Sequence, residues 1–253
     1  MRESVTVLAE DLKREPYASV LCYPRSCEAE LESRIGELRM LGVDAVEFSG
    51  KGSAFNVPVL GKGYVGVVVA ALVRGQRLAL KIRRVDADRP SLGHEAQMLA
   101  KANSVQVGPR LVGQSGNFLL MQLIEGDLLP VWLGSHVEME VVRGVLDDIM
   151  GQCWRLDLAG LDHGELSKAP KHLIVDEAEQ PWIFDFETAS DNRKPANVTA
   201  VCQYLFMGKG PVAAAVANSL GQRNREDIID ALRQYKKSMA RENFDLVRRI
   251  SLG

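Results

Sequence analysis

The segment that most restricts the fold is GKGYVGVV, residues 61–68, which has the pattern G-x-G-x-x-G-x-V. Such glycine patterns are common in turns, so the pattern alone does not distinguish a site from a structural turn. Before a helix it would indicate a dinucleotide-binding fold. Here VGVVVAALV (65–73) follows, and its β-branched residues predict a strand. With VPVL (57–60) on the other side, we expect a hairpin that can lie over phosphate groups.

The neighbouring runs extend this hairpin into a sheet. RLALKI (77–82) follows after the break Arg74-Gly75-Gln76, and short breaks between β-branched runs are typical of antiparallel hairpins. The turn-like segment GKGS (50–53) lacks the spacing of a Walker-type phosphate loop. Downstream, the sequence predicts a helix at about 91–103, with Ser91 as its N-cap, and strands at about 110–114 and 117–123.

The two ends of the chain differ in their patterns. The first 54 residues predict a strand (17–23), a helix (27–41) and a second strand (43–48). After Gly126 the periodicity becomes helical. The expected elements are a long helix at 136–158, short strands at 172–176 and 182–185, and helices at 197–207, 211–219 and 224–250. The fold class is therefore predicted as α+β, with an antiparallel sheet first and a mostly helical part after it.

Composition excludes several classes of protein. The chain has 253 residues, of which 46% are hydrophobic, and its net charge is -2, so overall charge indicates neither a nucleic-acid nor a membrane partner. No apolar run approaches the roughly 18 residues of a spanning helix, and the charged start does not resemble a signal peptide. The four cysteines lack both a disulfide framework and a CxxC pair. These features predict a cytoplasmic protein.

Two charged residues after the hairpin are candidates for phosphate binding. Lys81 lies in an apolar strand, where its ammonium could neutralise phosphate charge, although a surface lysine at a strand end is the simpler interpretation. Glu95 lies in the following helix and could hold the ammonium in place, or it could be an ordinary solvated glutamate.

Two segments after the long helix carry further carboxylates. LDHGEL (161–166) is similar to the catalytic loop H-R-D of kinases, in the H-G-D form, with Glu165 where an aspartate is expected. The expected metal-binding asparagine is missing, and His172 stands nearest to its place. IFDFE (183–187) matches the start of D-F-G, with Asp185 as the metal-binding aspartate and Glu187 in place of glycine. Each match is weak alone, but they occur in the order that a kinase requires.

The chain as a whole resembles atypical protein kinases of the RIO and KEOPS-complex type, and more closely a group of archaeal predicted serine/threonine kinases. The resemblance covers about residues 55–207 and implies a bilobal fold, with an N-lobe at 55–124, a compact C-lobe at 125–253 and residues 1–54 packed on the N-lobe. No A-P-E motif follows Asp185, and only 188–196 separate Asp-Phe-Glu from the next predicted helix. Such a short segment is typical of small kinases without an activation loop.

The resemblance also implies cofactors and roles. ATP and magnesium would be bound, with Gly61, Gly63 and Gly66 over the phosphates and the backbone of Gln122, Leu123 and Ile124 against the adenine. Lys81 and Glu95 would position phosphates, Glu165 would act on the acceptor hydroxyl, and Asp185 with His172 would hold the metal. The implied function is that of an ATP- and magnesium-dependent phosphotransferase, an atypical serine/threonine protein kinase that transfers the γ-phosphate of ATP to a hydroxyl; the identity of the acceptor is not predicted. Alternatives are an ATP-binding switch, an ATPase or a pseudokinase subunit of a larger assembly, or a small-molecule kinase.

Overall fold

The computed structural model describes residues 4–25, 27–135 and 138–253. The chain divides into two compact units, the first formed by Met1–Gln97 and Arg110–Leu123, the second by Met98–Pro109 and Ile124–Gly253. The described part of the chain combines helices with sheets in which every strand pair is antiparallel. This confirms the predicted α+β class.

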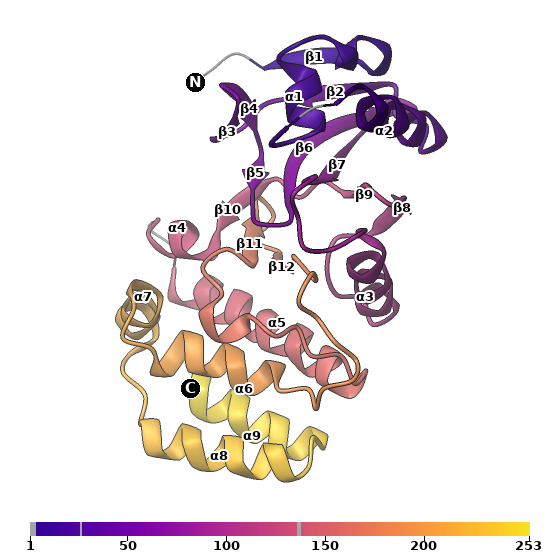
Figure 1. Ribbon diagram of the computed structural model, residues 1–253. Helices are drawn as coiled ribbons and strands as arrows, with labels where there is room; N and C mark the ends of the chain where they lie inside the picture. The colour runs from indigo at the N-terminus through magenta and orange to yellow at the C-terminus, as the bar shows by residue number, and fades with distance from the viewer. Residues whose placement is uncertain (1–3, 26, 136–137) are drawn as a thin grey trace. The chain divides into compact units, whose positions relative to one another are not determined.

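The first unit is built on a seven-stranded sheet (Figure 1). Its order is β1 (Val5–Leu8), β2 (Ala45–Phe48), β6 (Gly66–Val73), β7 (Gln76–Arg83), β9 (Phe118–Gln122) and β8 (Leu111–Gln114), and β5 (Gly61–Lys62) pairs with β6. A separate hairpin joins β3 (Gly52–Ala54) to β4 (Val57–Val59). The strands predicted around 57–82 and 110–123 are therefore confirmed, whereas β1 has no counterpart in the sequence predictions.

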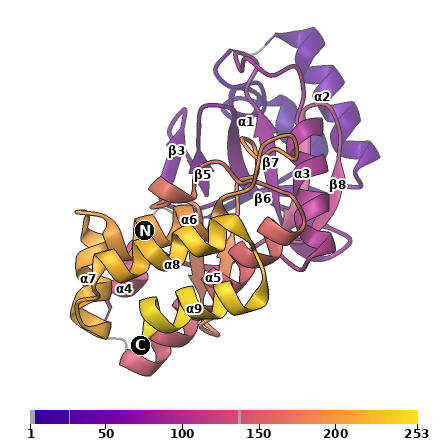
Figure 2. The ribbon, with the colours of Figure 1, turned by 90° about the horizontal axis from the view of Figure 1, so that it is seen from below.

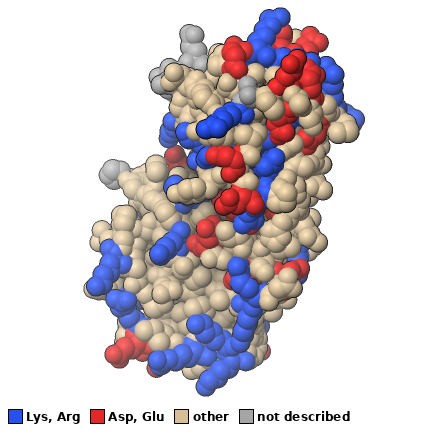
Figure 3. All heavy atoms as spheres, in the orientation of Figure 1, with Lys and Arg blue, Asp and Glu red and all other residues tan. Residues whose placement is uncertain are grey.

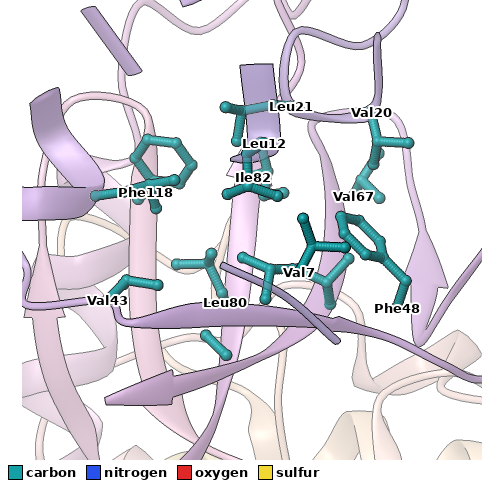
Figure 4. Packing of buried hydrophobic residues seen from close by; sticks show 14 of the residues in the cluster. Val7, Leu12, Val20, Leu21, Val43, Phe48, Val67, Leu80, Ile82 and Phe118 are labelled. Atoms are coloured by element: carbon teal, nitrogen blue, oxygen red, sulfur yellow. The ribbon is translucent and has the colours of Figure 1, made fainter. Parts of the chain in front are cut away.

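One face of this sheet carries the hydrophobic core of the first unit (Figure 4). Leu80 and Ile82 of β7 pack there with Phe118 and with residues of two helices, α1 (Tyr17–Leu21) and α2 (Glu28–Met40). Successive strand residues face opposite sides of a sheet, so Lys81, between Leu80 and Ile82, is on the face away from this core. The helix α3 (Gly93–Ser104) follows β7 and brings Glu95 to Lys81.

Tyr17–Leu21 of the segment YASVLCY (17–23) forms a helix, so the prediction of this segment as a strand is wrong. Its seven residues are too short for apolar periodicity to separate a strand from a buried helix. Pro16 occupies the N-cap position, and Tyr17 stacks on Phe48 with ring centroids 4.9 Å apart. Val20 and Leu21 are buried in the same core. Tertiary packing therefore decides the helix.

Residues 1–54 contribute two strands to the same sheet as the hairpin, because β1 pairs with β2 and β2 with β6. The predicted helix at 27–41 and strand at 43–48 correspond to α2 and β2. Arg34 of α2 is fully buried and donates hydrogen bonds to the carbonyl oxygens of Leu21 and Arg83 and to Asn117. These bonds connect α2 to the end of β7 and to the turn before β9.

The second unit combines a three-stranded sheet (Figure 1) with helices that Figure 2 shows from below. The sheet order is β10 (Gly126–Leu128), β11 (Leu173–Asp176) and β12 (Pro181–Ile183). Its helices are α4 (Leu129–Leu133), α5 (Met139–Leu158), α6 (Asn197–Cys202), α7 (Pro211–Leu220), α8 (Arg225–Lys237) and α9 (Arg241–Leu252). The first two residues of the helix predicted at 136–158 lie outside the described residues.

The single helix predicted over 224–250 is wrong, because the chain forms two helices, α8 and α9, which pack against each other. Ser238 and Ala240 between them have extended backbone conformations, and Trp154 of α5 donates a hydrogen bond to the carbonyl oxygen of Met239. No glycine or proline marks this break. The helix predicted at 197–207 corresponds to α6, which continues as a π-helical turn over Gln203–Met207.

Charged side chains are unevenly distributed on the second unit. α8 has exposed Arg225, Arg233, Lys236 and Lys237, and Figure 3 shows Lys and Arg side chains gathered over the C-terminal helices. The same helix also exposes Glu226, Asp227 and Asp230. Within the described ranges, no helix combines the length and the apolar character that crossing a bilayer requires.

Candidate functional site

The glycine-rich segment forms a tight hairpin in the first unit, but the strand that pairs with β6 is Gly61–Lys62, whereas β4 of the predicted VPVL strand pairs with β3. β5 pairs with β6, and the amide of Gly63 donates to the carbonyl oxygen of Gly66 over 2.8 Å. A Cβ atom at Gly66 would lie 2.9 Å from the carbonyl oxygen of Ile82 and 3.0 Å from Cγ of Lys81. Gly66 is therefore required by the close approach of β6 to β7 and to the Lys81 side chain. Because a strand follows the glycines, the dinucleotide-binding interpretation is excluded.

The other two glycines of the hairpin have no such packing requirement. Among the described residues, no atom outside the adjoining chain lies within 4 Å of a Cβ built on Gly61, and for Gly63 the nearest is 3.8 Å away. Neither glycine has a positive φ angle. Packing thus explains why position 66 is a glycine, but it does not explain Gly61 or Gly63. At these two positions the lack of a side chain lets another group approach the backbone closely.

Lys81 and Glu95 form a buried ion pair in the first unit. The ammonium of Lys81 donates to Glu95 Oε1 over 2.8 Å and lies 2.8 Å from Oε2. Their side chains are only 8% and 5% exposed. The interpretations of Lys81 as a surface lysine and of Glu95 as a solvated glutamate are therefore wrong. The pair lies next to Gly66, since the Lys81 side chain is among the atoms that a Cβ at Gly66 would touch.

In the second unit, strand pairing brings His172 and Asp185 together. Leu173 of β11 is opposite Ile183 of β12, so the residues just before β11 and just after β12 meet at one end of the hairpin. The amide of Phe184 donates to the carbonyl oxygen of His172 over 3.1 Å. His172 Nδ1 lies 3.7 Å from Asp185 Oδ2. Asp185 has a φ angle of 70°, a left-handed conformation that aspartate tolerates better than most residues and that often marks functional positions.

Glu165 joins the same group of side chains. It directly precedes the 3-10 turn Leu166–Lys168, and its Oε2 lies 3.4 Å from Nε2 of His172. Ligand atoms of Glu165, His172 and Asp185 all lie within 4.8 Å of one another. His172 is thus placed between the two carboxylates, with one ring nitrogen toward each.

His163, the histidine of the H-G-E segment, has a structural role. It is fully buried, its ring Nε2 is 3.2 Å from the carbonyl oxygen of Phe184, and its ring packs edge-on against Phe186. Burial lowers the pKa of His163 to about 4, so the ring is neutral at pH 7 and donates from Nε2. This bond fixes the start of the Asp185 loop relative to the H-G-E segment.

The sequence predictions missed a buried polar network that holds the H-G-E segment. The side chain of Asn197, at the start of α6, accepts from the amide of His163 and donates to the carbonyl oxygen of Leu161 and to Asp157. Asp157 also accepts from the hydroxyl of Tyr235. The available signal was the position of Asp157, four residues after Cys153 on the apolar stripe of the long predicted helix, where a carboxylate must find partners.

A second set of contacts joins the H-G-E segment to the loop after Asp185. Asp162 and Ser190 exchange backbone hydrogen bonds, and the guanidinium of Arg193 bonds to the Asp162 carboxylate and to the carbonyl oxygen of Thr188. Gly164 has a φ angle of 90°, and a Cβ there would lie 2.7 Å from Arg193. The short 188–196 segment is therefore bound along the H-G-E segment.

The residues predicted to contact adenine lie where the chain passes between the two units. Gln122 ends β9, and the boundary falls between Leu123 and Ile124. The amide of Gln122 donates to the carbonyl oxygen of Arg110 over 2.9 Å. Their contact with a nucleotide stays a prediction.

The donor set of the second unit fits a magnesium ion only in part. Asp185 and Glu165 offer the carboxylate oxygens that Mg²⁺ prefers. His172 offers an imidazole nitrogen, which suits Zn²⁺ and other nitrogen-binding transition ions better. The predicted magnesium ligands therefore combine an oxygen ligand that suits Mg²⁺, from Asp185, with a nitrogen ligand that suits it less well, from His172.

Comparison with known proteins adds no relative: no protein-family model matches the chain, and no curated protein is significantly similar to it.

Proposed function

We propose that this chain is an ATP-dependent phosphotransferase that requires a divalent cation and has a bilobal, kinase-like fold of the RIO and KEOPS-complex type. The observation that carries the proposal is the buried ion pair of Lys81 and Glu95 next to Gly66. A predicted cytoplasmic location belongs to the same proposal.

A buried lysine–glutamate pair calls for a functional explanation. Removing both charges from water is expensive, and an apolar pair of similar volume is often as stable or more so. Lys81 is a compact positive charge held by Glu95 on the sheet face away from the hydrophobic core. The glycine-rich hairpin adjoins it, with Gly61 and Gly63 open to close approach. This arrangement suits an ammonium that neutralises nucleotide phosphates beneath a glycine-rich flap.

The second unit supplies groups for the transfer itself. In the proposed reaction an acceptor hydroxyl oxygen forms a bond to the γ-phosphorus of ATP, the bond from that phosphorus to the β,γ-bridging oxygen breaks, and ADP leaves. Glu165 accepts the hydroxyl proton. When bound, a divalent cation at Asp185 would supply charge neutralisation for the phosphates. The Asp157–Asn197 network and Arg193 hold the H-G-E segment in place for this role.

The proposed acceptor is a serine or threonine hydroxyl, either of another protein or of this chain itself. The short 188–196 segment, bound along the H-G-E segment through Asp162 and Arg193, favours a small-molecule acceptor as the second candidate. An ATPase or ATP-binding switch is favoured by a different observation, the placement of Glu165 3.4 Å from His172. A carboxylate held by the histidine is less available to an acceptor hydroxyl.

Transfer of label from γ-labelled ATP tests the proposal. Wild-type protein is incubated with divalent cation and with itself, a generic protein or a metabolite mixture as acceptor. Label should appear on an acceptor, and Lys81→Ala and Asp185→Asn should abolish it, whereas Lys237→Ala, the same substitution on an exposed position of α8, should leave it unchanged. Release of labelled phosphate without any labelled acceptor would support the ATPase instead. Neither transfer nor hydrolysis by folded protein would refute the proposal.

A further inference from the structure

We propose that His172 is a metal ligand, and that it makes the site at Asp185 selective for a divalent transition ion such as Mn²⁺ over Mg²⁺. The role of the ion rests on the proposed function, whereas the binding of the ion does not. It names the ion that the second unit takes and gives Glu165 a part in orienting the histidine.

The two nitrogens of the His172 ring have different surroundings. Nδ1 is buried, is nearest to Asp185 Oδ2 at 3.7 Å, and has no hydrogen-bond partner among the described residues. A buried polar atom without a partner is rare and calls for an explanation such as an ion. A cation bound jointly by Nδ1 and the Asp185 carboxylate would provide the missing partner.

The other nitrogen is oriented by a carboxylate. Nε2 lies 3.4 Å from Glu165 Oε2, on the opposite side of the ring from Nδ1. Histidines that bind metals usually donate their second N–H to a carboxylate or carbonyl, which fixes the tautomer and increases the basicity of the ligating nitrogen. With its proton on Nε2 toward Glu165, His172 would present an unprotonated Nδ1 to the cation.

Ligand chemistry then decides which ion is preferred. Mg²⁺ requires oxygen ligands in a nearly ideal octahedron and is rarely bound by imidazole. Mn²⁺ shares with Mg²⁺ a preference for octahedral oxygen sites, but as a transition ion it binds an imidazole nitrogen more readily than Mg²⁺ does. A site of one imidazole and one or two carboxylates therefore binds Mn²⁺ more tightly than Mg²⁺, and the nitrogen ligand is the cause.

Metal binding to nucleotide-free protein tests the inference without any activity assay. Mn²⁺ is titrated into wild-type protein and followed by the paramagnetic resonance signal of the free ion, and Mg²⁺ is then added as competitor. Wild type should bind Mn²⁺ roughly tenfold or more tightly than Mg²⁺. His172→Asn should reduce Mn²⁺ affinity roughly tenfold or more and leave Mg²⁺ affinity equal or higher. His94→Asn, the same change at an exposed histidine, should alter neither.

Two results would overturn the inference: equal affinity of wild type for both ions, or an unchanged Mn²⁺ affinity in folded His172→Asn. If that variant does not fold, nuclear magnetic resonance of wild type decides. Zn²⁺, a diamagnetic transition ion, should shift the imidazole ¹⁵Nδ1 resonance of His172 and not that of His94, and the reverse pattern would contradict the assignment. If wild-type protein binds Mn²⁺ selectively but transfers no phosphate, the proposed function is refuted and the metal site is not.

Discussion

The ammonium of Lys81 lies 2.8 Å from both carboxylate oxygens of Glu95, and both side chains are almost completely buried. The two residues are fourteen positions apart, on β7 and on α3. Neither can lose its charge partner without leaving the other charge in a poorly solvated place. The pair is therefore expected to affect stability as well as phosphate binding.

Breaking this ion pair from one side should be strongly destabilising. Lys81→Met removes the ammonium that pairs with the buried Glu95 carboxylate, and we expect a loss of about 3–5 kcal/mol in the free energy of unfolding. The double variant Lys81→Met/Glu95→Leu removes both charges and should recover most of that loss. Urea unfolding of the two single variants and the double variant gives the comparison. Additive losses in the double variant would show that the two charges are not coupled.

The glycines of the hairpin should separate packing from ligand binding. Gly66→Ala places a Cβ 2.9 Å from the carbonyl oxygen of Ile82 and should reduce stability by about 1–3 kcal/mol. Gly61→Ala meets no described atom and should change stability by less than about 0.5 kcal/mol. If the hairpin covers phosphates, Gly61→Ala should nevertheless weaken ATP binding in calorimetry. Unchanged ATP affinity in Gly61→Ala would argue against a phosphate flap.

Arg34 should be essential to the fold of the first unit. Arg34→Met removes donors to one buried and one partly buried carbonyl oxygen and to Asn117, so we expect a loss of roughly 2–4 kcal/mol. Arg39→Met, on an exposed position of the same helix, should change stability by no more than about 0.5 kcal/mol. Thermal or urea unfolding measures both. Similar effects of the two substitutions would mean that the buried guanidinium contributes little.

Asn197 should support the H-G-E segment. Asn197→Ala leaves the amide of His163, the carbonyl oxygen of Leu161 and a carboxylate oxygen of Asp157 with fewer partners, at a cost of about 2–4 kcal/mol. Any folded fraction should transfer phosphate more slowly than wild type. The matched control is Asn192→Ala on an exposed position. Full stability and transfer in Asn197→Ala would show that the network does not position Glu165.

Thiol reactivity should report burial of the cysteines. Burial raises the pKa of Cys22 to about 11 and of Cys202 to about 12, and it raises that of Cys153 as well, so at pH 8 these thiols are almost entirely protonated. Cys27 is exposed. A disulfide reagent at pH 8 should therefore label one thiol per folded chain rapidly and all four in denaturant. Rapid labelling of two or more thiols in folded protein would contradict this packing.

Local patterns predicted the sheet around the hairpin well. The β-branched runs at 57–82 are separated by glycine-containing breaks, and successive residues alternate in side-chain direction although both faces of β6 and β7 are largely buried. The same alternation places Lys81 opposite Leu80 and Ile82 in side-chain direction. The sequence did not decide whether Lys81 is buried, because a lysine near the end of a strand is equally compatible with an exposed position. Its burial depends on α3, which brings Glu95 to it.

Elsewhere the deciding interactions were distant in sequence. The run at 17–23 became helical through packing of Tyr17 on Phe48, and the break before α9 is fixed by a hydrogen bond from Trp154. The proximity of Glu165, His172 and Asp185 depends on the pairing of β11 with β12. Spacing along the chain suggested a role for each residue, but it could not show that His172 lies between two carboxylates.

A crystal structure with a non-hydrolysable ATP analogue and Mn²⁺ tests the central claim most directly. The account predicts a phosphate oxygen within about 3 Å of Lys81 Nζ, with the Lys81–Glu95 pair retained, and the cation bound to Asp185. An analogue bound without any contact to Lys81, or no bound analogue at saturating concentration, would contradict it.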